Sequence, residues 1–99
     1  MAEIYCPLCG ESRTVDPSAS LNCSNCDAEI HTDSNARISK VQVRTGRLLA
    51  KLKSLASRGK KSEAEALLNT LLSSTMSYKD NRVRVTKARD MFAKWLSEH

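Results

Sequence analysis

The sequence predicts a small α+β protein in two parts: a module of short antiparallel strands that carries the cysteines, and a following region of three helices. All four cysteines of the 99-residue chain lie within residues 6–26, in two close pairs. Nearly all leucines come later, at the three- and four-residue steps of amphipathic helices. Residues 1–40 carry three basic and six acidic side chains, and residues 41–99 carry thirteen and five, for net charges of −3 and +8. We therefore predict a cysteine domain over residues 1–33 and a basic helical domain over residues 34–99.

The spacing of the cysteines is that of metal ligands. It reads Cys-x2-Cys-x13-Cys-x2-Cys, and the predicted ligands are Cys6, Cys9, Cys23 and Cys26. Two residues between thiols allow a tight turn to direct both sulfurs at one point, and four thiolates suit one structural Zn²⁺ per chain. Gly10 and Asp27 follow the two pairs, at positions where such a turn needs a left-handed backbone.

Other uses of four cysteines stay open at this point. Two disulfides are disfavoured because the chain shows no signal-peptide pattern, so we expect a reducing, intracellular compartment. A rubredoxin-like iron site is expected to have a longer gap between the pairs and more aromatic neighbours, whereas an iron–sulfur cluster uses the same four ligands. His31 lies five residues after the last cysteine, and we expect a surface side chain there because four thiolates already fill a tetrahedral shell.

Short strands are expected beside both cysteine pairs. Residues 3–5 lead into the first pair, residues 13–15 return from it, and residues 28–31 leave the second. Together with the Cys-Pro-Leu-Cys-Gly form of the first pair, this arrangement resembles the zinc ribbon family. The resemblance covers residues 1–33, and we identify no motif of a known protein family in residues 35–99. Because zinc ribbons are common in transcription factors, RNA polymerase subunits, ribosomal proteins and replication enzymes, the resemblance implies a role in the machinery of gene expression.

The first predicted helix covers residues 35–58. Its apolar or small positions follow steps of three and four: Ile38, Val41, Thr45, Leu48, Leu49, Leu52, Leu55 and Ala56. Asp33 or Ser34 can cap its start, and Gly59 can end it. Gly46 lies in its interior at a cost of about 1 kcal/mol relative to alanine, so a helix that starts near Arg47 is the alternative.

Two further helices complete the predicted bundle. The second begins at Ser62 with the capping box Ser62-Glu63-Ala64-Glu65 and fades by Ser77. Its predicted apolar stripe is Leu67, Leu68, Leu71, Leu72 and Thr75 or Met76. The third helix covers residues 82–97, with a stripe of Val85 or Ala88, Met91, Phe92, Trp95 and Leu96. The linkers are short, which favours antiparallel neighbours and a small three-helix bundle.

Basic side chains of the helices form a candidate surface for nucleic acid. Arg44, Arg47, Lys51 and Arg58 fall within a sector of about 60° on the first helix, at about 100° per residue. The third helix adds Arg84, Lys87 and Lys94 along one side. The predicted contacts are Arg44, Arg47, Lys51, Arg58, Lys60, Lys61, Arg82, Arg84 and Lys87. Such a face can neutralise phosphates with little sequence preference, and the alternative is an ordinary solvated helix surface.

These features predict an accessory regulator of transcription rather than an enzyme. The chain has no Ser-His-Asp arrangement, no phosphate-binding glycine loop and no pair of clustered carboxylates. It also has no apolar run long enough to span a membrane. The expected partners are nucleic acid, DNA or RNA, and/or RNA polymerase or another large protein machine. The alternative is a protein-binding adaptor or inhibitor. Such a protein could form a homodimer through the first helix, because the stripe from Ile38 to Leu55 has the spacing of a short coiled coil.

Overall fold

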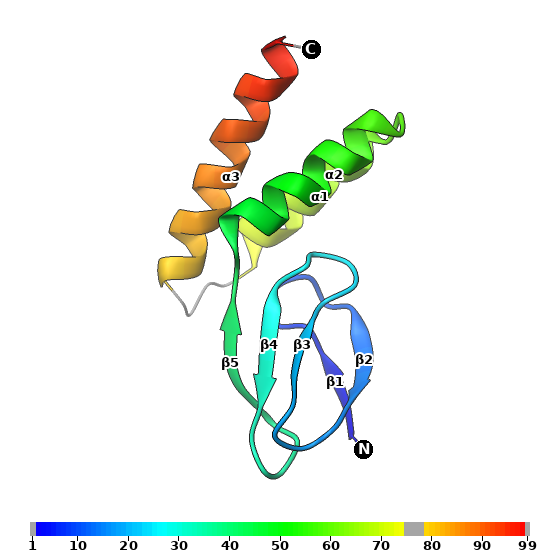
Figure 1. The fold of residues 1–99 in the computed structure, drawn as a ribbon, viewed down its shortest axis with the longest axis vertical. Helices are drawn as coiled ribbons and strands as arrows, with labels where there is room; N and C mark the ends of the chain where they lie inside the picture. Colours follow the sequence, from blue (N-terminus) through cyan, green and yellow to red (C-terminus); the bar gives the residue numbers. More distant parts are fainter. Residues whose placement is uncertain (1, 75–78, 99) are drawn as a thin grey trace.

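A computed structural model describes residues 2–74 and 79–98, and it confirms the α+β class. Within those residues, five strands are followed by three helices (Figure 1). Their bounds are β1 (Ala2–Tyr5), β2 (Ser12–Val15), β3 (Ser20–Asn22), β4 (Glu29–Thr32), β5 (Ile38–Gln42), α1 (Thr45–Ser57), α2 (Lys61–Ser73) and α3 (Lys79–Glu98). The strands occupy one end of the molecule and the helices the other, and β5 runs directly into α1 (Figure 1).

The strands form two small antiparallel sheets. β1 pairs with β2, so that Ala2 lies opposite Val15. The second sheet has the order β3-β4-β5, and its register places Leu21 opposite Ile30 and Ile30 opposite Val41. The strands expected at residues 3–5, 13–15 and 28–31 are confirmed with ends shifted by one residue.

The strand β5 shows that the single helix predicted over residues 35–58 is wrong. Ile38–Gln42 pairs with β4, and a β-bulge interrupts the register between His31 and Thr32. Ile38 and Val41 are three residues apart, which fits a helix period, but β-branched side chains also suit a half-buried strand. The pairing with β4 decides between the two. α1 therefore begins at Thr45, close to the predicted alternative start, and strands give way to helices after Gln42 rather than at residue 33.

Asp33 stabilises a turn rather than the start of a helix. Its carboxylate accepts hydrogen bonds from the backbone amides of Asn35 and Arg37, at 2.8 and 3.0 Å. The bond from Arg37 is the main reason that the pKa of Asp33 lies below its ordinary value. Ala36 takes a left-handed conformation in the same turn, with φ of 61°. The side chain predicted as a helix cap thus shapes the β4–β5 hairpin.

The end of α1 lies where the sequence predicts it, whereas the start of α2 differs from the prediction. Gly59 follows α1 with φ of +75°, as the predicted end requires. The predicted capping box is not formed, because α2 begins one residue before Ser62. The carbonyl of Lys60 accepts the amides of Glu63 and Ala64, at 3.1 Å each, so Ser62 already lies in the first turn.

One hydrophobic core joins the sheets to the helices. It includes Leu8 and Ile30 from the strand region and residues from all three helices, among them Leu48, Leu52, Ala64, Leu67, Leu71, Val85, Ala88 and Phe92. Met91, predicted in the stripe of α3, is 44% exposed. Thr75 and Met76, predicted at the end of the stripe of α2, lie outside the described residues. Among the helices of the described chain, none combines the length and the apolar character needed to cross a membrane.

Candidate metal centre

The four cysteines lie on two turns with the same backbone geometry. In the first turn, the amides of Gly10 and Cys6 donate to the carbonyls of Cys6 and Glu11, at 2.8 Å each. The second turn repeats both hydrogen bonds 17 residues further along the chain, again at 2.8 Å. Gly10 and Asp27 have φ of +81° and +62°, which confirms the left-handed positions predicted for them. We call these segments, residues 6–10 and 23–27, the two cysteine turns.

The two turns bring the four sulfur atoms together. Cys6 Sγ lies 3.8 Å from Cys26 Sγ, and Cys9 Sγ lies 3.5 Å from Cys23 Sγ. All four sulfurs lie within 4.8 Å of one another. A tetrahedral ion with metal–sulfur bonds of about 2.3 Å requires sulfur–sulfur edges of about 3.8 Å, and these two distances are near that value. A disulfide requires about 2.05 Å, and all four cysteines are free.

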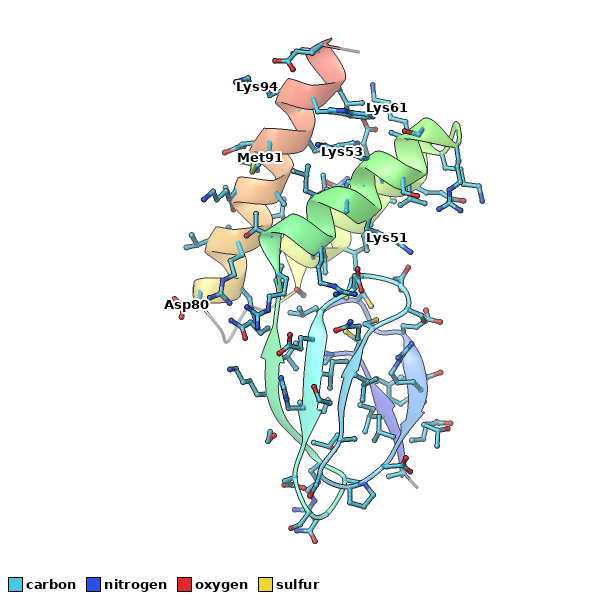
Figure 2. All side chains as sticks on the ribbon, in the orientation of Figure 1. Lys51, Lys53, Lys61, Asp80, Met91 and Lys94 are labelled. Atoms are coloured by element: carbon cyan, nitrogen blue, oxygen red, sulfur yellow. The ribbon has the colours of Figure 1, made fainter. Side chains whose placement is uncertain are left out.

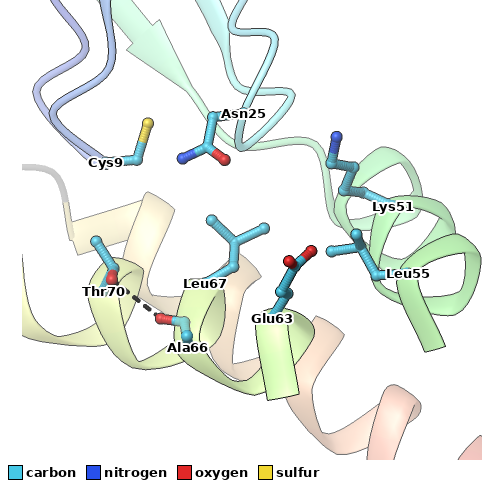
Figure 3. A pocket seen from close by; sticks show the side chains of 8 residues that line it. All are labelled: Cys9, Asn25, Lys51, Leu55, Glu63, Ala66, Leu67 and Thr70. Atoms are coloured by element: carbon cyan, nitrogen blue, oxygen red, sulfur yellow. Dashed lines mark hydrogen bonds between the residues drawn. The ribbon is translucent and has the colours of Figure 1, made fainter. Parts of the chain in front are cut away.

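The cluster is closed on most sides by the protein. Cys6, Cys23 and Cys26 are buried, whereas Cys9 is half-buried. Cys9 and Asn25 face α1 and α2 across a cavity of about 410 Å³, which Lys51, Leu55 and the α2 side chains Glu63, Ala66, Leu67 and Thr70 line (Figure 3). A metal ion bound here has all four positions filled by cysteine and none left for a substrate.

Hydrogen bonding among the thiols raises the pKa of two of them and lowers the pKa of a third. Hydrogen bonding to Cys23, together with burial, raises the pKa of Cys6 to about 11 and also raises the pKa of Cys26. Hydrogen bonds from Cys26 and Cys6 lower the pKa of Cys23. Burial and hydrogen bonding thus disfavour the thiolate form of Cys6 and Cys26 and favour that of Cys23. Because thiolates are the form that binds a metal ion, metal binding at this cluster would release protons.

His31 is not part of the cluster. Its Nε2 lies 2.7 Å from Oε1 of Glu29 on the same strand, β4. This contact is the main reason that the pKa of Glu29 lies below its ordinary value, with Arg44 as a second cause. In the described part of the chain, the sulfur cluster consists of the four cysteines, as the sequence predicts.

Three residues of the predicted basic face contact the strand region, although the side chains of Arg44 and Arg47 stay about half-exposed. Arg44 Nε lies 3.2 Å from Glu29 Oε2, and Arg47 Nε lies 3.5 Å from Asp27 Oδ2. Lys51 Nζ lies 3.3 Å from the carbonyl oxygen of Ser24 in the second cysteine turn. Arg47 and Lys51 of α1, and Arg44 directly before it, therefore hold the helix against β4 and the second cysteine turn. The acidic charge of residues 1–33 is partly matched by these basic side chains.

The remaining predicted basic residues lie in two separate groups. Arg58, Lys60 and Lys61 lie at the turn between α1 and α2, and Arg82, Arg84 and Lys87 lie in the first half of α3. Figure 1 shows these two places at opposite ends of the helical layer, and α1 between them is about 20 Å long. The structure therefore does not bring the nine predicted residues onto one face.

The sequence analysis missed Lys53 as a candidate. Lys53 lies on the flank of α1 away from the strands, with its Nζ 5.8 Å from the centre of the Trp95 ring. Lys53 lies four residues after Leu49, which places it beside the apolar stripe of α1. This spacing was the one feature of the sequence that indicated its position.

Comparisons with models of protein families, with curated proteins and with solved structures gave no match to this chain.

Proposed function

We propose that this chain is a zinc-binding accessory regulator of transcription, which binds nucleic acid through basic helical side chains and/or docks on RNA polymerase. Zinc is the proposed ion because four thiolates at tetrahedral spacing, without an open position, are typical of structural zinc sites. The proposal gives the chain no enzymatic activity, since the cysteines are used as ligands. The resemblance of residues 1–33 to zinc ribbons supports a place in transcription.

The observation that carries the nucleic-acid part is the positive charge that remains after internal pairing. Arg44, Arg47, Lys61 and Arg89 each have a carboxylate partner. Among the side chains described, no carboxylate partner is found for Lys51, Lys53, Arg58, Lys60, Arg82, Arg84, Lys87 and Lys94. Cations without a carboxylate partner keep a charge that can replace the counterions of a phosphate backbone.

Affinity capture from cell extract, with and without nuclease, tests this proposal together with a direct binding assay. We expect the purified protein to bind DNA or RNA at low salt and to lose affinity steeply as salt rises, because released counterions drive binding. We expect capture of transcription proteins in the untreated extract. If the protein binds neither nucleic acid at low salt nor RNA polymerase after nuclease treatment, the proposal is wrong.

A protein-binding adaptor or inhibitor is the second candidate, and one feature favours it. An apolar cavity of about 230 Å³ lies between α2 and α3, with Leu68, Leu72, Phe92 and Leu96 in its lining. The coiled-coil dimer considered from the sequence loses its basis, because Ile38 and Val41 lie in a strand and Leu48, Leu52 and Leu55 are buried within the chain. Partner binding that persists at high salt would favour this candidate, since apolar contacts are not screened.

A further inference from the structure

One flank of α3 carries a row of basic side chains. Arg84, Lys87, Met91 and Lys94 follow one another at steps of three, four and three residues. At about 100° per residue, they fall within about 80° of one another on the helix surface. Val85, Ala88 and Phe92, which are buried, lie on the side next to this row. The row is therefore at the solvent edge of the core.

The same flank lies beside α1, on the side opposite the basic side chains that contact the strand region. A shallow cavity of about 330 Å³ between the two helices is lined by Leu49 and Lys53 of α1 and by Met91, Lys94, Trp95 and Glu98 of α3. Figure 2 shows Lys53 between α1 and α3, and Met91 and Lys94 on α3. We define the α1–α3 face by three cations: Lys53, Lys87 and Lys94. Arg84 lies in the same row of α3, but its guanidinium donates to the carbonyl oxygen of Val43, next to β5, at 3.5 Å.

The charges of the α1–α3 face are not neutralised by internal pairs. Among described residues, none of these three cations has a carboxylate partner. The acidic neighbours are Asp80 and Glu98 at the two ends of the row, and Asp90, which pairs with Arg89 at 3.3 Å. The row from Arg84 to Lys94 is about 15 Å long, and that length of duplex carries roughly nine phosphates.

Trp95 is engaged inside the protein rather than offered as a stacking platform. Its ring stacks with Phe92 at a centroid distance of 5.9 Å, and Lys53 Nζ lies over it. Base stacking needs an accessible aromatic face. The α1–α3 face thus presents positive charge around an exposed Met91, which suits contact with a phosphate backbone.

We propose that the α1–α3 face is the surface through which the chain binds nucleic acid. Lys53, Lys87 and Lys94 contact backbone phosphates without base stacking, and the binding has little sequence preference. Arg47 and Lys51 instead hold α1 against the second cysteine turn, and Arg44 pairs with Glu29 of β4. This inference rests on the proposed function, and it replaces the broad basic surface predicted from the sequence with one flank of two helices.

Two matched double variants test the inference. Lys87→Glu/Lys94→Glu changes the α1–α3 face, and Arg58→Glu/Lys60→Glu makes the same change in charge at the turn between α1 and α2. All four side chains are exposed and without a carboxylate partner, so both variants should keep the fold. Fluorescence anisotropy with short labelled DNA and RNA duplexes measures affinity between about 50 and 200 mM salt. Thermal melts and metal content check that each variant is folded.

The expected result separates the two variants. The face variant should bind at least about tenfold more weakly than the wild type, and its log–log salt slope should be smaller by about 1.8, or about 0.9 for each lost contact. The control variant should bind much closer to the wild type. Equal or greater loss in the control overturns the inference but leaves the proposed function standing.

A different outcome distinguishes failure of the proposed function. If the wild type binds neither duplex at low salt, its binding to a polyglutamate peptide is measured next. Binding of that peptide, weakened in the face variant, would assign the α1–α3 face to an acidic protein partner and overturn the inference. No binding to any of the three probes overturns the inference and removes the nucleic-acid part of the proposed function.

Discussion

Asn81 connects α3 to the strand region through two buried hydrogen bonds. Its Oδ1 accepts from the amide of Val43, and its Nδ2 donates to the carbonyl of Val41, both at 2.9 Å. All three residues are buried, with exposures of 2%, 2% and 4%. Asn81→Ala leaves one amide and one carbonyl of the backbone without a protein partner. Each unsatisfied buried group costs about 1–3 kcal/mol, so the free energy of unfolding should fall by about 2–6 kcal/mol.

Chemical denaturation followed by circular dichroism measures this loss. Asn81→Asp is a second variant: it keeps an acceptor for Val43 but turns a carboxylate oxygen toward the carbonyl of Val41, so it should destabilise at least as much at neutral pH. Asn69→Ala, at an exposed position on α2, is the matched control and should change stability by less than about 0.5 kcal/mol. If Asn81→Ala costs no more than the control, the strand region and α3 are not coupled as described.

Three further predictions concern the core, the contact of Arg47 with the second cysteine turn, and acid stability. Leu52 is 0% exposed, so Leu52→Ala should lower the free energy of unfolding of the protein by about 2–5 kcal/mol, measured by chemical denaturation. A decrease under about 1 kcal/mol would contradict the place of Leu52 in the core. Arg47→Gln removes a half-exposed ion pair and should cost at most about 1 kcal/mol by the same assay, with duplex affinity nearly unchanged; a tenfold loss of affinity would contradict its docking role. Hydrogen-bond donors lower the pKa values of Glu29 and Asp33, so the stability that the two carboxylates give the fold is complete above their ordinary values of 4.5 and 3.8 and is lost as pH falls further. Thermal melts of Glu29→Gln at falling pH should show a smaller loss of stability than melts of the wild type, and identical profiles would contradict this prediction.

The cysteine turns could be predicted from the sequence because their geometry is local. The two-residue spacing and the residues after each pair, Gly10 and Asp27, determine the backbone of each turn without help from the rest of the chain. The apolar periodicity of α1, α2 and α3 was a similarly local signal. It located the buried side chains Leu52, Leu71 and Val85.

The missed features depend on contacts between distant residues. Whether Ile38 and Val41 belong to a helix or a strand is decided by pairing with β4, which helical spacing does not reveal. The direction in which Arg47 points depends on how α1 packs against the second cysteine turn. A helical wheel places charges around one helix, but it cannot say which flank another element covers. Lys53 was overlooked for the same reason.

In the proposed function, Cys6, Cys9, Cys23 and Cys26 bind one structural zinc ion, at the cluster that their sulfur atoms form. Elemental analysis of the purified protein, with protein concentration measured on the same sample, tests it most directly. We predict one zinc ion per chain, and a loss of that zinc in Cys23→Ser, because three remaining thiolates leave the shell open. A wild-type protein that contains no zinc after purification and takes up none when zinc is added under reducing conditions would contradict the account.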